Sequence, residues 1–196
     1  GGGGGGGEEP RQSFPDIAYW NPTIVTDANG SAKVDVPLPD NLTTWTAIAN
    51  GVTAQTQVGK ATGDTLVTKD LIVRPVLPRF LNVGDKTTLG TIVRNSTDVT
   101  QTVTVALTAT NLTLPQVLTR TLTISAGQSA SVNWNITVPQ ANALAASYSP
   151  SAAIPLSTTV TMSARGTGVS DAVQLSLPIE PFGEKRVVAS AGQADD

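Results

Sequence analysis

Apolar and polar residues alternate along most of the second half of the chain, as they do in strands that bury one face. The clearest case is residues 131–139, where Val132, Trp134 and Ile136 share one face. Similar stretches recur between turns, and about seven strands at this spacing are typical of an all-β, immunoglobulin-like or fibronectin-like antiparallel β-sandwich. The strands predicted for this sandwich are residues 71–78, 87–95, 102–110, 120–126, 131–139, 157–166 and 171–181.

The first half of the chain supplies fewer strands. Residues 17–26 and 33–39 are predicted strands that flank a tight turn at Asn29-Gly30, and two more strands are predicted at residues 45–52 and 61–70. About four strands form one sheet with an uncovered face, so we expect a partial β-sheet unit that is completed by strands outside this chain. An independent four-stranded sheet packed on the sandwich is the alternative.

The chain begins with seven glycines. Glycine loses the most backbone entropy on ordering, and this run has no apolar group to offset that cost. Residues 1–13 are therefore predicted to be a disordered linker, with order beginning near Phe14. Only residues 140–148 show a weak helical pattern.

Composition excludes most catalytic chemistry. The chain has 196 residues, a net charge of −3, no His and no Cys. The commonest general base, the thiolate nucleophile and sulfur-bound zinc are thus all missing, and no catalytic residue and no cofactor is predicted. No metal site is predicted either, because Asp85, Asp98 and Asp171 lie in different predicted turns, where aspartates usually bond their own backbone.

The same composition also limits which kinds of partner and location are expected. No basic cluster is large enough to neutralise several phosphates, so nucleic acid is not expected as a partner. No run of about 18 apolar residues occurs, so no membrane-spanning segment is predicted in this chain. A sandwich without cysteine fits an extracellular bacterial protein and is also compatible with the cytosol.

Three tracts follow one another along the chain: AYWNP at 18–22, DANGSAKVDVPLPDNLTTW at 27–45, and VTKDLIVRPVLPRFLNVGDKTTLGTIVRN at 67–95. These tracts resemble the α2-macroglobulin family in its bacterial form. The resemblance is strong from residue 14 to about residue 110 and continues more weakly through SDAVQLSLPIEPFGEKR at 170–186.

The resemblance implies a role for the opening segment. In this family the stretch before the F-P and W-N-P residues is a bait that proteases cut, and cutting triggers a collapse that traps the protease. The implied bait candidates are Glu9, Arg11, Gln12, Ser13 and Phe14. Since Pro15 blocks cleavage after Phe14, Arg11–Gln12 is expected to be the bond that trypsin cuts first.

The resemblance also implies a division of the chain. Residues 1–13 would be the bait tail, 14–69 a partial macroglobulin-like unit that closes the bait-bearing domain, 70–183 a complete macroglobulin-like β-sandwich, and 184–196 the start of the next segment. The family's thioester needs a Cys, so no thioester lies in this chain.

The implied function is a non-enzymatic scaffold portion of a broad-spectrum endopeptidase inhibitor. Its partners would be target endopeptidases, bound through the parent protein, and neighbouring macroglobulin-like and thioester-type domains. Its location would be extracellular, periplasmic or at the bacterial cell surface. Two alternatives stay open: the glycine run is a plain linker, or the chain is a stalk or adhesin module that binds protein or carbohydrate, with Trp20 or Trp45 stacking on sugars.

Overall fold

The computed structural model describes residues 9–140 and 156–180, and within these ranges every regular element is a β-strand. This confirms the predicted all-β class. The strands are β1 Thr44–Val52, β2 Val58–Leu66, β3 Leu71–Val76, β4 Leu81–Asn82, β5 Lys86–Asn95, β6 Gln101–Ala109, β7 Thr119–Ile124, β8 Ser129–Thr137, β9 Ser157–Arg165 and β10 Ser170–Glu180.

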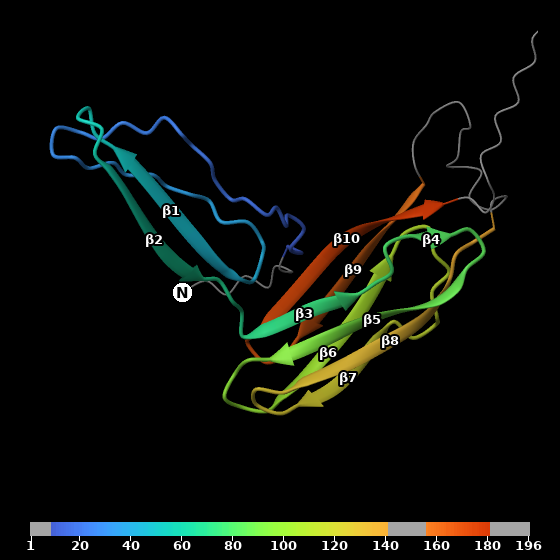
Figure 1. Cartoon of the computed structure of the whole chain (residues 1–196). Coiled ribbons are helices and arrows are strands. Elements are labelled where there is room, and N and C mark those ends of the chain that lie inside the picture. Colours follow the sequence, from blue (N-terminus) through green and yellow to red (C-terminus); the bar gives the residue numbers. More distant parts are fainter. Residues whose placement is uncertain (1–8, 141–155, 181–196) are drawn as a thin grey trace, which may run out of the picture.

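Two of the sheets form a sandwich (Figure 1). One sheet has the strand order β4-β10-β9-β6-β7 and the other β3-β5-β8. All pairings in them are antiparallel except that of β10 with the short β4, which is parallel. Gly84 lies in the turn by which the chain passes from β4 in one sheet to β5 in the other, and Gly168 lies in the hairpin turn between β9 and β10 of one sheet; both adopt positive φ angles, of 84° and 72°.

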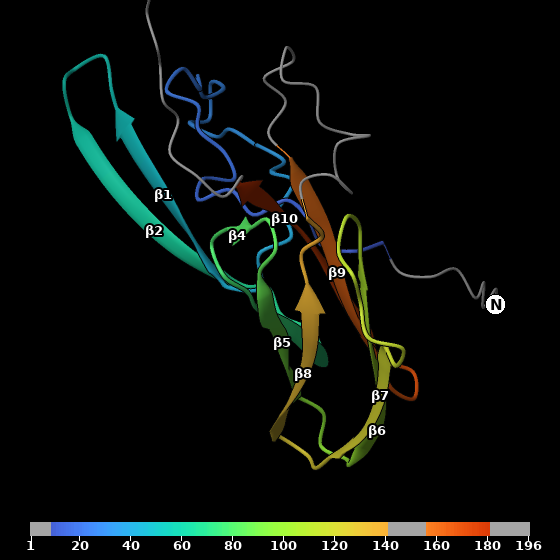
Figure 2. The same cartoon turned by 90° about the vertical axis from the view of Figure 1, so that its right-hand side faces the viewer.

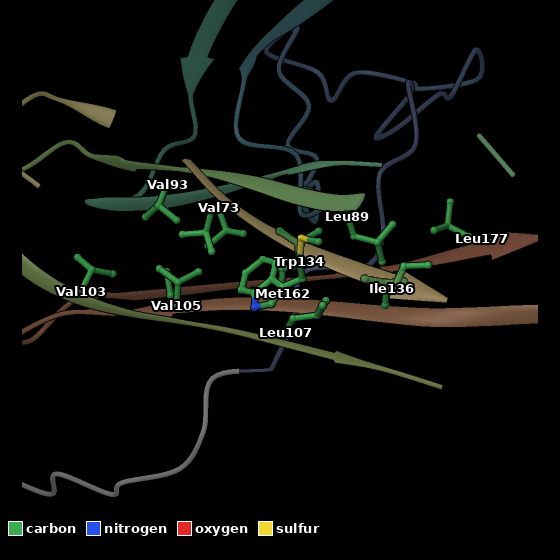
Figure 3. Packing of buried hydrophobic residues seen from close by; sticks show 14 of the residues in the cluster. Val73, Leu89, Val93, Val103, Val105, Leu107, Trp134, Ile136, Met162 and Leu177 are labelled. Atoms are coloured by element: carbon green, nitrogen blue, oxygen red, sulfur yellow. The ribbon is translucent and has the colours of Figure 1, made fainter. Parts of the chain in front are cut away.

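The core lies between these two sheets and is built from the alternating positions. Trp134 on β8 is 1% exposed and lies beside Met162 of β9 and Leu107 of β6, both fully buried (Figure 3). The alternation in residues 131–139 therefore predicted the buried face correctly. Side chains of this size dominate the hydrophobic stabilisation of a sandwich, because they remove the most apolar area from water.

The β1–β2 hairpin forms a separate two-stranded sheet that projects away from the sandwich (Figures 1 and 2). Its apolar side chains are largely exposed: Val52 by 74%, Val58 by 83% and Leu66 by 69%. Between residue 14 and the hairpin the chain runs mostly without regular structure. A two-stranded sheet with uncovered apolar side chains is marginal by itself in water, and the division that makes residues 14–69 a partial unit stays a prediction.

Two predicted strands are wrong. Residues 17–26 and 33–39 have no strand partner in the structure, although the turn between them forms, with Gly30 at a φ of 77°. The carboxylate of Asp27 accepts hydrogen bonds from the amides of Asn29 and Ser31 there. Alternation alone does not make a strand, because a strand also needs a neighbour for its backbone groups. The weak helical pattern at 140–148 falls almost wholly outside the described residues.

Candidate functional site

The segment that follows the glycine run is attached to the sandwich. Arg11 forms a parallel bridge with Val173 of β10. The Arg11 amide donates to the carbonyl of Ala172 at 2.8 Å, and the amide of Gln174 donates to the Arg11 carbonyl at 2.9 Å. Arg11 therefore extends the five-stranded sheet by one residue, along the part of β10 that β4 leaves unpaired.

The side chain of Arg11 points at a buried carboxylate. Its guanidinium forms a two-pronged ion pair with Asp171, with Nε 2.9 Å from Oδ1 and Nη2 2.7 Å from Oδ2. The Asp171 side chain is 0% exposed and that of Arg11 is 12% exposed. Paired N–H···O bonds of this geometry are among the strongest in proteins, because donor and acceptor are both charged and the fork fits the carboxylate.

Asp171 also collects contacts from the start of the sandwich. The amide of Val73 on β3 donates to its Oδ2 at 2.8 Å, and Lys69 Nζ lies 3.4 Å from its Oδ1. Arg11 Nη2 in turn donates to the Val73 carbonyl at 3.1 Å. We call Arg11, Asp40, Lys69, Val73 and Asp171 the Arg11 cluster. It joins the opening segment, the link between hairpin and sandwich, and both sheets.

Asp40 is the fifth residue of the cluster and binds both Arg11 and the residues that follow it. Its carbonyl accepts from Arg11 Nη1 at 3.3 Å, and its Oδ2 accepts from the amides of Gln12 and Ser13, each at 2.9 Å. These two amide hydrogen bonds, from Gln12 first and Ser13 second, lower the pKa of Asp40 below its ordinary value of 3.8, and the positive charge of Arg11 adds to the effect.

The remaining predicted bait residues fall on either side of this cluster. Glu9 is exposed, Gln12 shares a side-chain hydrogen bond with Gln174 at 3.2 Å, and Phe14 packs on the core with its ring 5.8 Å from the Arg11 guanidinium carbon. The prediction of disorder up to Ser13 is therefore wrong for residues 9–13. The physical reason is the Arg11 cluster, whose charge-assisted bonds offset the entropy of ordering the segment.

The three aspartates considered as metal ligands in the sequence have other roles or places in the described residues. Asp171 lies in a strand and not in a turn, and Asp85 caps its own turn by accepting from the Asn82 amide at 2.8 Å. Among the residues the structure describes, no group of three or more acidic, His or Cys side chains is placed to hold a metal. Within the same residues no helix has the length and apolar character needed to span a membrane.

Sequence reasoning missed the Arg11 cluster, yet a signal for it exists. Asp171 stands at the head of the apolar stretch AVQLSL, and a carboxylate in a buried strand requires a cationic partner. The partner could not be named from the sequence, because Arg11 is 160 positions away. The glycine run beside Arg11 suggested an unattached chain instead.

Comparisons with known proteins match the chain to a family model and to curated bacterial proteins. The model of the "Alpha-2-macroglobulin family" matches residues 17–107. An alpha-2-macroglobulin homolog of Nostoc is 37% identical over 87 residues, which are 44% of this chain and 5% of that protein. Alpha-2-macroglobulin of Thermotoga maritima is 30% identical over 178 residues, which are 90% of this chain and 11% of that protein. The chain thus spans a small part of the length of these relatives.

Solved structures show the same fold. Trypsin-activated alpha-2-macroglobulin of Escherichia coli superimposes with a TM-score of 0.65 at 19% identity, over 87% of this chain and 12% of that one. Salmonella alpha-2-macroglobulin reacted with methylamine gives a TM-score of 0.62 at 20% identity, over 81% of this chain and 10% of that one. The sequence matches show that the chain belongs to the alpha-2-macroglobulin family, and the shared fold agrees with them.

Proposed function

We propose that this chain is a non-enzymatic scaffold portion of a secreted, periplasmic or surface-bound bacterial protease trap. The observation that carries the proposal is the family match over residues 17–107, which starts only a few residues after the glycine-rich segment. The partners are endopeptidases, as the trypsin-activated state of the Escherichia coli relative suggests, together with neighbouring macroglobulin-like and thioester-type domains of the parent protein.

The cleavable bait in this proposal lies before Arg11. Glu9 is the one bait candidate on that side of the cluster, and it is exposed. Gln12 and Ser13 have their amides bound to Asp40, and Phe14 packs against the core. These four residues from Arg11 to Phe14 serve as the anchor of the bait and not as the bait itself.

The experiment uses the intact parent protein. Cutting in the segment before Arg11 should be followed by a compaction of the parent that small-angle scattering detects. The present chain alone is the matched control: at micromolar concentration it should leave trypsin-like, chymotrypsin-like and elastase-like activity unchanged, because a scaffold portion has no cage to close. A parent that is cut without changing shape, or inhibition by the chain alone, would contradict the trap.

A further inference from the structure

The backbone around the Arg11–Gln12 bond is already hydrogen-bonded on both sides. Before the bond, the amide and the carbonyl of Arg11 are paired with β10 at 2.8 and 2.9 Å. After it, the amides of Gln12 and Ser13 are both held by Asp40 Oδ2 at 2.9 Å. The Ser13 carbonyl accepts from the Asp40 amide at 3.0 Å, so that Asp40 closes a ring around the residues after the bond.

An endopeptidase must form its own hydrogen bonds with the backbone amides and carbonyls on both sides of the bond that it cuts. It binds several substrate residues in extended form and pairs with their backbone, as an added strand does at a sheet edge. An arginine-specific enzyme also needs the guanidinium in its own acidic pocket. Here the guanidinium is committed to Asp171, Val73 and Asp40, with 12% of the side chain exposed.

We propose that Arg11, Asp40 and Asp171 form a clamp that closes the Arg11–Gln12 bond to proteases and sets the downstream limit of the cleavable segment. Cutting at this bond requires the segment to leave β10 and expose the buried carboxylate of Asp171. A cut made before Arg11 leaves the new end held on the sandwich. The clamp thus reverses the sequence-based expectation that Arg11–Gln12 is the first bond to be cut.

The contacts of Arg11 with the sandwich raise the free energy needed to open the segment before a protease can bind it. Cleavage of a protected site follows the population of the opened form when opening is fast compared with cutting. Removing Arg11 from its place leaves Asp171 with Lys69 and the Val73 amide alone. That loss opposes opening, and any change that weakens the clamp raises the open population and the cutting rate in proportion.

The test is limited trypsin digestion of the full chain, followed by mass spectrometry of each product. Arg11→Lys keeps a basic residue that trypsin accepts, but a single ammonium cannot reproduce the two-pronged pair. Asp40→Ala frees the Gln12 and Ser13 amides and leaves Arg11 in place. We expect each variant to be cut after residue 11 at least tenfold faster than the unchanged chain.

A matched control distinguishes local protection of the Arg11–Gln12 bond from a loss of stability of the whole chain. Asp35→Ala removes a carboxylate that lies 3.6 Å from Lys33 Nζ, with both side chains exposed, and it should leave the rate at residue 11 unchanged. Cutting after Arg94 and Arg165 reports on the sandwich as a whole, and in the two clamp variants those rates should rise far less than the rate at residue 11. An acceleration at residue 11 that clearly exceeds any at the sandwich sites supports the clamp.

Two outcomes overturn it. One is an unchanged chain that loses residues 1–11 as fast as the variants do. The other is an acceleration that appears equally at residue 11 and at the sandwich sites, which would make these residues merely structural. The inference rests on the proposed function only in taking endopeptidases as partners. Because it is measured on this chain, its failure is distinct from a parent that fails to compact.

Discussion

At the scale of single residues, Trp134 and Trp20 show how burial decides what a side chain contributes to the free energy of unfolding. Trp134 is 1% exposed in the middle of the core, whereas Trp20 is 79% exposed. We expect Trp134→Ala to lower the free energy of unfolding by about 3–5 kcal/mol, since it removes buried contacts and leaves a cavity. Trp20→Ala, its matched control, should change it by less than about 0.5 kcal/mol.

Urea denaturation of both variants, with the sandwich transition followed by circular dichroism, measures these values. Trp134→Phe adds a finer comparison. The Trp134 Nε1 donor is buried with no hydrogen-bond partner, so a ring without that donor should be tolerated better than alanine. Equal losses for the two tryptophan-to-alanine variants would contradict the placement of the core.

Asp40 gives a prediction about pH at the same scale. Its pKa is lowered in the folded state by the amide hydrogen bonds of Gln12 and Ser13, so its contribution to docking is complete above its ordinary value of 3.8. That contribution is lost as the pH falls through the lowered value. Amide NMR shifts of Gln12 and Ser13 should therefore titrate together below pH 3.8, and Asp40→Asn should abolish the step. A midpoint at or above the ordinary value would refute these bonds.

At the scale of elements, Asn95 ties together the turns at one end of the sandwich. It is fully buried, and its Nδ2 donates to the carbonyls of Val99, Ile124 and Ser125 at 2.8, 3.0 and 3.2 Å. Asn95→Asp would set a carboxylate against three carbonyl oxygens. We expect it to lower the free energy of unfolding by more than about 3 kcal/mol, because an unpaired buried charge is so costly.

The control for this substitution is Asn135→Asp on β8. The Asn135 Oδ1 only accepts from Thr88 Oγ1, at 2.9 Å on an exposed face, and a carboxylate can accept the same bond. Chemical denaturation should therefore find that variant within about 0.5 kcal/mol of the unchanged chain. A similar loss of unfolding free energy for both substitutions would mean that the hydrogen bonds of Asn95 do not stabilise the turns.

Element by element, the sequence predicted the sandwich far better than the opening segment. The strands around Trp134 and Val105 were found because alternation, length and flanking turns all agreed. The two-residue β4 was missed, since it is too short to show a period. Residues 33–39 alternate equally well but have no partner strand. The Arg11 cluster was missed because it is a long-range charge pair, which local periodicity does not report.

At the scale of the whole molecule, the two parts of the chain differ in how much they bury. The β1–β2 hairpin exposes Ile48 by 58% and Val58 by 83%, while the two sheets after residue 70 enclose a continuous core. An isolated two-stranded sheet is marginal in water, and its open edges favour association. Residues 14–68 alone should therefore give poorly dispersed amide NMR signals or aggregate. Sharp, dispersed signals would contradict an incomplete unit.

Residues 69–186 alone should fold and unfold in one cooperative transition, because they hold both sheets and the whole core around Trp134. They lack Arg11, and Asp171 keeps only Lys69 and the Val73 amide among the contacts of the cluster. We therefore expect the shortened chain to be less stable than the full chain by about 1.5–3 kcal/mol, as for the loss of charged hydrogen bonds. Arg11→Met in the full chain should lose a similar amount and serves as the matched comparison in urea denaturation. A shortened chain as stable as the full one would mean that the opening segment adds nothing to the sandwich, and the clamp would then lack the energy to protect its bond.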